Sequence, residues 1–473
     1  MTLSFILVFS ALSSVYIYAD APKEFLAEAE ERKELPIQSD QTLNWPAGPK
    51  IGAEGALLME ANTGSILYSK NIDEKLYPAS VTKMLTALVV LDNCKLDEMV
   101  TFSQEAIDSI NWREDANIGI GPGNSITVEQ CLYGLLVGSA NEVAYALAEH
   151  VSGPGNLPAF ADLMNEYAKN LGCTNSHFVT PNGIHNEDHY TSCHDLGLIA
   201  KEFFANELLC KMSSTTSYKI PKTSTQPRDD MVVYAKSKLH PGKEYAYDNL
   251  VGTKTGYTDI ARQTLVSCAE KDGFKLICVI MKEEDPYQFT DTITLFDYGF
   301  DNFTAVNIAD NDTKYSIQSL NFFSTKSDFF GSSKPILQID PADYILLPVG
   351  EDFSSVTSSL SYDGLEANEL ARVNYYYNDA FVGFASIVAA SEEAPVFDFG
   401  EKKIDTETEV DEDNILVINI TKVIGVILLI AVVLVIVFIV RSKVNASTKW
   451  KRRKSLRRYV NSRTDKLDWK HFK

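Results

Sequence analysis

The pattern of apolar and polar positions predicts a hairpin followed by a run of helices. GALLMEANTGSILYSK (55–70) predicts two strands around an Asn-Thr-Gly turn. Apolar residues recur with the period of a helix from Ser80 to about Leu91 and again over 127–150. AFADLMNEYAKNLG (159–172) is typical of an amphipathic helix that ends at a glycine.

Strand patterns return after this helical region. QTLVSCAEKDGFKLICVIMK (263–282) predicts a hairpin around a Lys-Asp-Gly turn, and TDTITLFDYGF (290–300) predicts a helix behind it. Helices that lie between early and late strands predict an α+β domain over 46–300. From 301 to 390 apolar and polar residues alternate as they do in strands, which predicts a smaller β-rich domain.

Apolar segments near the two ends predict targeting to a membrane. The first, LSFILVFSALSSVYIYADA, contains an Ala-Asp-Ala cleavage pattern and predicts a signal peptide over 1–21. No Lys or Arg precedes it, so an uncleaved membrane anchor is the alternative. Residues 423–440 have no charged or strongly polar side chain and would span roughly 27 Å as a helix, close to the hydrocarbon core of a bilayer. They predict a transmembrane helix.

Charge is divided unevenly along the chain, whose formal net charge is −21. Residues 441–473 carry 13 Lys/Arg against 2 Asp/Glu, a net of +11, which leaves −32 for the residues before them. The positive-inside rule therefore predicts a basic cytoplasmic tail over 441–473 and an extracytoplasmic body. The acidic body argues against a nucleic acid partner. Two polar, acidic segments predict a linker over 22–45 and a stalk over 391–413.

The cysteines and histidines predict neither a disulfide framework nor a metal site. The seven cysteines are an odd number and include no C-x-x-C pair. The seven histidines do not cluster with them at ligand spacing, so we expect no metal and no cofactor. We interpret His185, His189 and His194 as residues that form local hydrogen bonds in a loop.

LYPASVTKMLTAL (76–88) contains the first candidate for chemistry. Ser80 and Lys83 lie one helical turn apart on one face. A serine hydroxyl needs an adjacent base to act as a nucleophile, and a lysine can serve where burial or a nearby cation lowers its pKa. On this motif alone, a helix cap at Ser80 is the simpler interpretation.

Two further motifs change that balance. Ser-Ala-Asn at 139–141 is weak by itself, because Asn141 could cap the following helix. Lys-Thr-Gly at 254–256 could be a surface turn, but a cation and a hydroxyl on one strand can also bind a substrate carboxylate, and the glycine lets a ligand approach the backbone. S-x-x-K, S-x-N and K-T-G in this order form the active-site triplet of penicillin-recognising serine enzymes. The three motifs together favour catalysis.

With these motifs, and with FVTPNGIHNEDHYTS and DYGF, the region 50–300 resembles the low-molecular-mass penicillin-binding proteins, specifically the D-alanyl-D-alanine carboxypeptidases. The resemblance implies an α+β fold like that of transpeptidases and β-lactamases, an antiparallel sheet with helices, followed by a small β-rich domain and a membrane attachment. It implies a serine-type hydrolase that removes the terminal D-alanine from peptidoglycan stem peptides ending in D-Ala-D-Ala. β-Lactam antibiotics would acylate the same serine.

The resemblance also implies roles for the motif residues. Those of the first two motifs would be catalytic: Ser80, Lys83, Ser139 and Asn141. Those of the third would bind substrate: Lys254, Thr255, Gly256 and Tyr257. Ser80 would attack the carbonyl, Lys83 would take its proton, and Ser139 would pass a proton to the leaving D-alanine. Backbone N–H groups of Ser80 and Tyr257 would form the oxyanion hole.

Two positions depart from the family pattern. Gln288 stands where family members usually carry an arginine that helps to hold the substrate carboxylate, and Arg262 stands where a glycine is usual. Arg262 or Lys282 could supply the lost charge. An endopeptidase with the same residues and a non-catalytic cell-wall protein with the same fold are the alternatives, while the lack of an E-x-x-L-N pattern disfavours a β-lactamase. The segments at the two ends predict a single-pass cell-membrane protein with an extracytoplasmic catalytic domain.

Overall fold

The computed structural model describes residues 23–315, 337–363, 365 and 369–389, all within one compact unit. The predicted signal peptide, acidic stalk, transmembrane helix and basic tail lie outside these residues. Among the residues that the structure describes, no helix has the length and apolar character needed to cross a bilayer.

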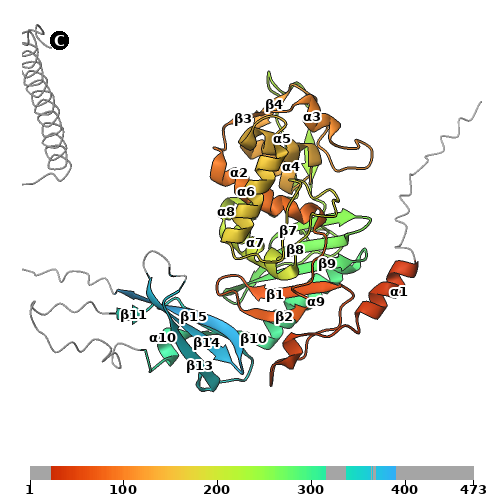
Figure 1. The fold of residues 1–473 in the computed structure, drawn as a ribbon. Coiled ribbons are helices and arrows are strands. Elements are labelled where there is room, and N and C mark those ends of the chain that lie inside the picture. Colours follow the sequence, from red (N-terminus) through yellow and green to blue (C-terminus); the bar gives the residue numbers. More distant parts are fainter. Residues whose placement is uncertain (1–22, 316–336, 364, 366–368, 390–473) are drawn as a thin grey trace, which may run out of the picture. The chain divides into compact units, whose positions relative to one another are not determined.

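An antiparallel sheet of five strands lies at the centre of the fold, in the order β2-β1-β9-β8-β7 (Figure 1). The bounds of its strands are Gly55–Glu60 (β1), Ile66–Lys70 (β2), Leu250–Thr258 (β7), Arg262–Lys271 (β8) and Phe274–Glu283 (β9). Both predicted hairpins, at 55–70 and 263–282, are therefore confirmed. β7, which carries the Lys-Thr-Gly motif, is an edge strand of this sheet.

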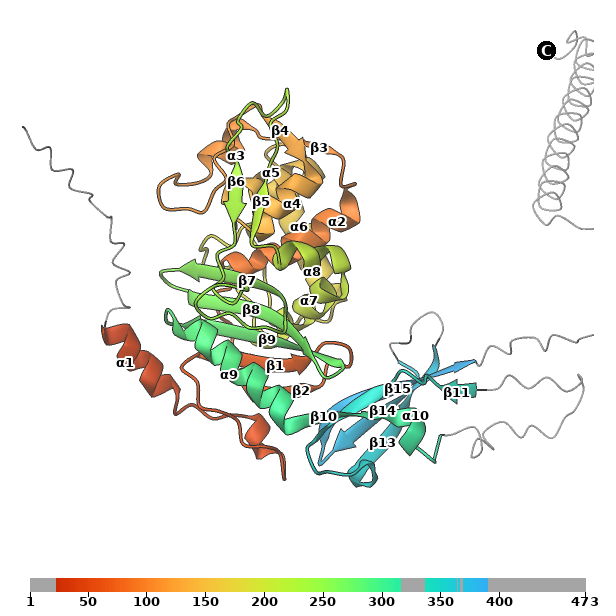
Figure 2. The ribbon, with the colours of Figure 1, turned by 180° about the vertical axis from the view of Figure 1, so that it is seen from behind.

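Helices cover both faces of the sheet. Successive residues of a strand point to opposite faces, and in β1 the side chain of Leu57 approaches Gly197 of α7 (Cys193–Ala205), whereas that of Leu58 approaches Gly299 of α9 (Tyr287–Asn302). Figure 2 shows α9 running along its face of the sheet. The predicted helix at 290–300 is thus confirmed, and Gly299 of its DYGF sequence lies against Leu58 and Leu276 of the sheet.

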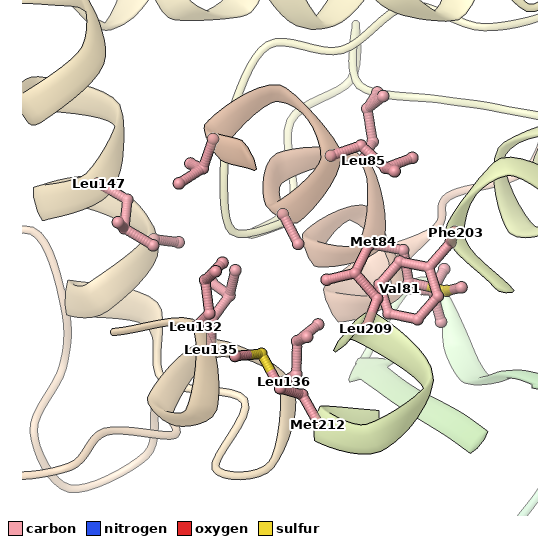
Figure 3. Close-up of a cluster of buried hydrophobic side chains, with 14 of the residues drawn as sticks. Val81, Met84, Leu85, Leu132, Leu135, Leu136, Leu147, Phe203, Leu209 and Met212 are labelled. Carbon is pink, nitrogen blue, oxygen red and sulfur yellow. The ribbon is translucent and has the colours of Figure 1, made fainter. Parts of the chain in front are cut away.

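The remaining helices form a lobe around α2 (Lys83–Asn93). Its members are α3 (Gln104–Asp108), α4 (Val128–Leu136), α5 (Asn141–Ser152), α6 (Leu157–Asn170) and α8 (Glu207–Ser213), with the strand pairs β3 (Met99–Thr101)/β4 (Ser125–Thr127) and β5 (Ser217–Lys219)/β6 (Val232–Tyr234). Every residue of α2 from Lys83 to Val90 is buried, because its apolar residues surround the helix rather than form one stripe. Figure 3 shows Met84 and Leu85 of α2 in a cluster with side chains of α4, α5, α7 and α8. The start of α2 is therefore held by a packed core.

The β-rich region expected over 301–390 forms a second sheet. Its strands are β10 (Phe303–Asn307), β11 (Leu337–Ile339), β12 (Tyr344–Pro348), β13 (Val356–Ser361), β14 (Glu369–Tyr377) and β15 (Ala380–Ala389), with a short helix α10 (Ile308–Asn311). The order is β10-β12-β15-β14-β13, and β11 pairs with β15. Every second residue of β14 from Ala371 is buried, which is the alternation that predicted a strand.

The prediction of a linker over 22–45 is wrong for the residues that the structure describes. They form the helix α1 (Lys23–Arg32) and a short 3₁₀ helix, Ser39–Gln41. Arg32 is 7% exposed, and its Nε donates to Gly52 O at 2.8 Å. Trp45 is buried, donates from Nε1 to Leu67 O at 2.8 Å and lies against the ring of Phe303. A few anchoring side chains hold this segment, so its polar composition was misleading.

Candidate active site

Ser80 and Lys83 meet at the start of α2. Ser80 lies in a 3₁₀ turn, Ala79–Thr82, that leads into the helix. Lys83 is the first residue of α2, and its Nζ donates to Ser80 Oγ at 2.7 Å. The N-caps of the turn and of the helix are Pro78 and Thr82, and neither uses a side-chain hydrogen bond. The helix-cap interpretation of Ser80 is therefore wrong, and its hydroxyl faces an amine.

Lys83 is completely buried and has three polar partners. Besides Ser80, its Nζ donates to Asn141 Oδ1 and to the backbone O of Asn182, both at 2.7 Å. Burial and then the charge of Lys254 lower the pKa of Lys83 well below its usual range. A neutral amine in this place can accept the proton of the Ser80 hydroxyl.

The Ser-Ala-Asn motif supplies the next two groups from the turn before α5. Asn141 is the first residue of α5, the N-cap is Ala140, and no side-chain cap bond forms. The cap interpretation of Asn141 is therefore wrong, because its side chain accepts from Lys83 instead. Ser139 is buried in a left-handed conformation, with φ +58°, which a non-glycine residue adopts only at a cost. Its Oγ accepts from Lys254 Nζ at 2.8 Å.

The Lys-Thr-Gly motif on β7 closes the site. Lys254 is 2% exposed, and burial, followed by the charge of Lys236, lowers its pKa to about 7. A Cβ at Gly256 would lie 2.8 Å from Ser80 N and against the side chain of Thr264. Only glycine therefore lets the strand pass this close to the nucleophile. Tyr257, the next residue, is 49% exposed.

A fourth segment, Pro181-Asn182-Gly183, contacts the start of α2 through backbone oxygens. The backbone O of Asn182 accepts from Lys83, and that of Pro181 accepts from Thr86 Oγ1 at 2.6 Å. Gly183 has φ +79°, and a Cβ there would collide with Ala79 O. Pro-Asn-Gly is part of FVTPNGIHNEDHYTS, a stretch that supported the family resemblance. It contributes to the site through the backbone carbonyl of Asn182, and a backbone contact leaves no pattern of side chains in the sequence.

Comparisons with known proteins agree with this geometry. The family described as D-alanyl-D-alanine carboxypeptidase matches residues 42–285. The chain belongs to this family. The D-alanyl-D-alanine carboxypeptidase DacB2 of Mycobacterium tuberculosis is 31% identical over 271 residues, which are 56% of this chain and 87% of that relative. DacF of Bacillus subtilis is 30% identical over 257 residues, 53% of this chain and 63% of the relative, so the match spans less than two thirds of DacF.

Among solved structures, the Streptomyces K15 DD-transpeptidase is similar, with a TM-score of 0.50 and 30% identity over 54% of this chain and all of that chain. This likeness confirms the transpeptidase-like α+β fold.

In this family member the two cations expected to replace the family arginine are already paired. Arg262 donates to both carboxylate oxygens of Glu284, the shorter contact being 2.6 Å from Nη2 to Oε2. Lys282 Nζ lies 2.6 Å from Glu54 Oε2. Gln288 is 2% exposed, its Nε2 donates to Asp285 Oδ1 at 3.1 Å, and its Oε1 finds no hydrogen-bond partner among the described residues. Neither Arg262 nor Lys282 is therefore an unpaired cation.

Lys236 is a cation that the sequence analysis missed. It lines a small cavity together with Ser237, Thr253 and Thr255, and its charge lowers the pKa of Lys254. It is exposed and forms no hydrogen bond or ion pair with the part of the chain that the structure describes. An exposed lysine in a polar stretch has no distinguishing pattern, so only the fold reveals that it lines the same cavity as Thr255.

The loop histidines contact their neighbours. His189 is 2% exposed, its pKa is lowered to about 3 by burial, and it holds Thr82 Oγ1 at 2.9 Å through Nε2 and Val179 N through Nδ1. His185 packs edge-on against the ring of Tyr77, and His194 lies 3.7 Å from Asp73. Local hydrogen bonding is therefore confirmed for His189 alone. His185 Nδ1 is buried without a hydrogen-bond partner among the described residues, and His194 lies in α7 rather than in a loop.

The described residues contain a group of potential metal ligands that sequence spacing did not indicate. It is formed by Cys94, Glu98 and His150, whose ligand atoms lie within 4.8 Å of one another. The chain separation of 52 residues between Glu98 and His150 concealed it. All seven cysteines are free thiols.

Proposed function

We propose that this chain is a serine-type D-alanyl-D-alanine carboxypeptidase that acts through an acyl-enzyme on Ser80. One observation carries the proposal: a completely buried lysine of lowered pKa, Lys83, lies 2.7 Å from the hydroxyl of Ser80. The substrate class is the peptidoglycan stem peptide that ends in D-Ala-D-Ala, in keeping with the names of the relatives.

Acylation begins when Ser80 Oγ attacks the carbonyl carbon between the two D-alanines and its proton passes to Lys83 Nζ. Asn141 and the backbone O of Asn182 hold this amine in place at 2.7 Å each. The backbone N–H groups of Ser80 and Tyr257 stabilise the oxyanion, because donors already fixed in position need no reorganisation. The close passage of Gly256 along Ser80 N brings the backbone of the next residue, Tyr257, beside the nucleophile.

Collapse of the tetrahedral intermediate breaks the C–N bond and releases D-alanine. The leaving nitrogen takes a proton from the hydroxyl of Ser139, and the proton that Lys83 accepted from Ser80 passes to Ser139 in its place. Lys254 Nζ contacts Ser139 Oγ at 2.8 Å. The protonated form of Lys254, with Thr255, binds the terminal carboxylate of the substrate, and Lys236 adds positive charge at the same end. Water then hydrolyses the ester and regenerates Ser80. A β-lactam enters by the same attack, but its leaving group stays tethered to the acyl-enzyme.

The two alternatives differ from the carboxypeptidase in the substrate that acylates Ser80 or in whether an acyl-enzyme forms at all. An endopeptidase would use the same residues on a cross-link, and a non-catalytic cell-wall protein would keep the fold without acylation. The contacts among all three motifs favour a working nucleophile. Gln288, in place of the family arginine, bears on substrate preference rather than on the attack itself.

For the cellular setting we propose a single-pass cell-membrane protein. The apolar run 423–440 would anchor it, the basic residues of 441–473 would stay in the cytoplasm, and the catalytic part would face the cell wall. A signal peptide at 1–21 would direct export.

The test is D-alanine release from a peptide ending in D-Ala-D-Ala by the purified full chain in detergent. We expect release and covalent labelling by a fluorescent penicillin, and the loss of both in Ser80→Ala. Ser109→Ala, in another S-x-N sequence, is the matched control and should retain both. Label or release that survives in Ser80→Ala would refute the nucleophile. Labelling without release would instead favour the endopeptidase.

A further inference from the structure

A group of three potential metal ligands lies outside the active site, where α2 and α5 end. The thiol of Cys94, a carboxylate oxygen of Glu98 and a ring nitrogen of His150 all lie within 4.8 Å of one another. The closest approach is 3.1 Å, between His150 Nε2 and Glu98 Oε2. All three side chains are partly buried, so a small ion can reach them without passing through the core.

The backbone holds each of these residues in place. Cys94 is the C-cap of α2, and its N–H donates to Val90 O at 2.9 Å. Glu98 lies at the end of a turn that Lys95 closes, with Lys95 N donating to Glu98 Oε1 at 2.8 Å. The backbone O of Glu98 accepts from Val128 N at 2.9 Å, which fastens the turn to the start of α4. His150 occupies the last turn of α5. The arrangement therefore does not depend on a loose loop.

The donor set matches one ion in particular. We propose that Cys94, Glu98 and His150 bind Zn²⁺, with water as a fourth ligand. A thiolate and an imidazole select a borderline-soft ion over Mg²⁺ or Ca²⁺, which take oxygen ligands. Zinc bonds of about 2.0–2.3 Å in a tetrahedron place ligand atoms about 3.5 Å apart. His150 Nε2 and Glu98 Oε2 are 3.1 Å apart, and no pair of the three ligand atoms exceeds 4.8 Å. The thiolate and the carboxylate together balance the charge of the ion, and its binding displaces the thiol proton.

The position of the site suggests its use. α2 begins with Lys83 and α5 begins with Asn141, whose side chains are joined by a 2.7 Å hydrogen bond. The zinc ion would join the other ends of the same two helices, through Cys94 and His150. It would thus act as a brace for the part of the lobe that presents the lysine and the asparagine. The inference stands on these three residues and does not depend on the proposed carboxypeptidase activity.

The test uses the untagged full chain, stripped of metal and kept reduced. We expect one equivalent of Zn²⁺ to bind by calorimetry and to raise the melting temperature, and one equivalent of Co²⁺ to give a thiolate-to-metal charge-transfer band with tetrahedral d–d bands. Cys94→Ser should abolish the charge-transfer band, and both Cys94→Ser and His150→Ala should weaken zinc binding by about tenfold or more. Cys210→Ser is the matched control, because Cys210 is also a half-buried free thiol.

Three results would overturn the proposal. These are the absence of stoichiometric zinc binding to the wild-type chain, a charge-transfer band that persists in Cys94→Ser, and equal losses of affinity in Cys94→Ser and Cys210→Ser. Melting of each variant without metal shows whether it is folded. A variant that melts like the wild type but fails to gain stability from zinc supports the assignment.

Discussion

Two buried lysines with different tasks define the site at the scale of single residues. Burial lowers the pKa of both, and the charge of Lys254 lowers that of Lys83 further. Repulsion between the two ammonium groups favours the state in which only one is charged. Lys83, completely buried against Ser80, is the lysine that loses its proton and can therefore accept one from the serine, and Lys254 is left as the cation. The closeness of the two amines thus makes Lys83 the neutral lysine and Lys254 the charged one.

This division predicts how activity depends on pH. As pH rises through about 7, Lys254 loses its proton and with it the charge that binds the substrate carboxylate, so kcat/KM falls on the alkaline side. Lys236→Gln removes a neighbouring cation, so the pKa of Lys254 rises and this alkaline limb moves to higher pH. Because Lys236 is exposed, we expect a shift of less than about one pH unit that salt reduces.

The measurement is the pH profile of kcat/KM for D-alanine release, at low and high ionic strength. Lys219→Gln, an exposed lysine on β5, is the control and should leave the limb in place. An alkaline limb that stays fixed in Lys236→Gln, or that moves to lower pH, would contradict the assignment of charge to Lys254.

The site residues that the sequence could identify are those whose side chains belong to a motif. Ser80, Lys83 and Asn141 were expected from the order of the motifs and the family resemblance, and the structure brings them within hydrogen-bond distance. Asn182 contributes a carbonyl, and Lys236 contributes charge from a neighbouring segment. Neither contribution has a sequence pattern, because a backbone oxygen is common to all residues and proximity to Thr255 arises only in the folded chain.

At the scale of elements, the same limit explains the error at α1. Strands β1 and β9 were predictable because each is a short, mostly apolar segment next to a turn, and helix α9 because its apolar residues recur at helical spacing. α1 has few apolar residues, and Arg32 holds it through tertiary contacts. Nη2 of Arg32 lies 3.9 Å from Glu283 and 3.8 Å from Glu284, and Nε donates to Gly52 O. Glu283 and Glu284 are about 250 residues away from Arg32 in the sequence, so a local pattern around α1 cannot reveal these contacts.

These contacts predict that α1 is part of the stable unit. Arg32→Ala removes a buried hydrogen bond and leaves Glu283 without its positive neighbour, while burial already raises the pKa of that carboxyl. We expect the free energy of unfolding to fall by about 2–3 kcal/mol. Lys33→Ala, which removes only a surface pair with Glu30, should cost about 0.5 kcal/mol or less.

Urea denaturation of the two variants, followed by tryptophan fluorescence, measures this difference. Trp45 reports on the segment that follows α1, because it packs against Phe303. Equal stabilities of Arg32→Ala and Lys33→Ala would mean that α1 is attached only loosely and that the original linker interpretation was closer to its behaviour.

At the scale of the whole molecule, the active site depends on segments that meet only in the fold. Ser80 follows the first hairpin, Asn141 begins α5 and Lys254 lies on the far edge strand of the sheet. At Gly256, the absence of a side chain lets β7 contact the backbone of Ser80 at the start of the helical lobe. Motif order along the chain could indicate that these segments meet, but not how closely, since that depends on the packing of α2 within the lobe.

The division of charge along the chain predicts its orientation in the cell. A body of −32 before a tail of +11, with the apolar run 423–440 at the boundary, favours export of the body and retention of the tail. We expect the full chain to stay with membranes in alkaline carbonate and a chain ending at 413 to be released. In cells with an opened wall, external protease should digest the body but spare a C-terminal epitope. Digestion of that epitope would contradict the orientation. If the chain ending at 413 stayed with the membranes, the anchor would be an uncleaved segment at 1–21 instead of 423–440.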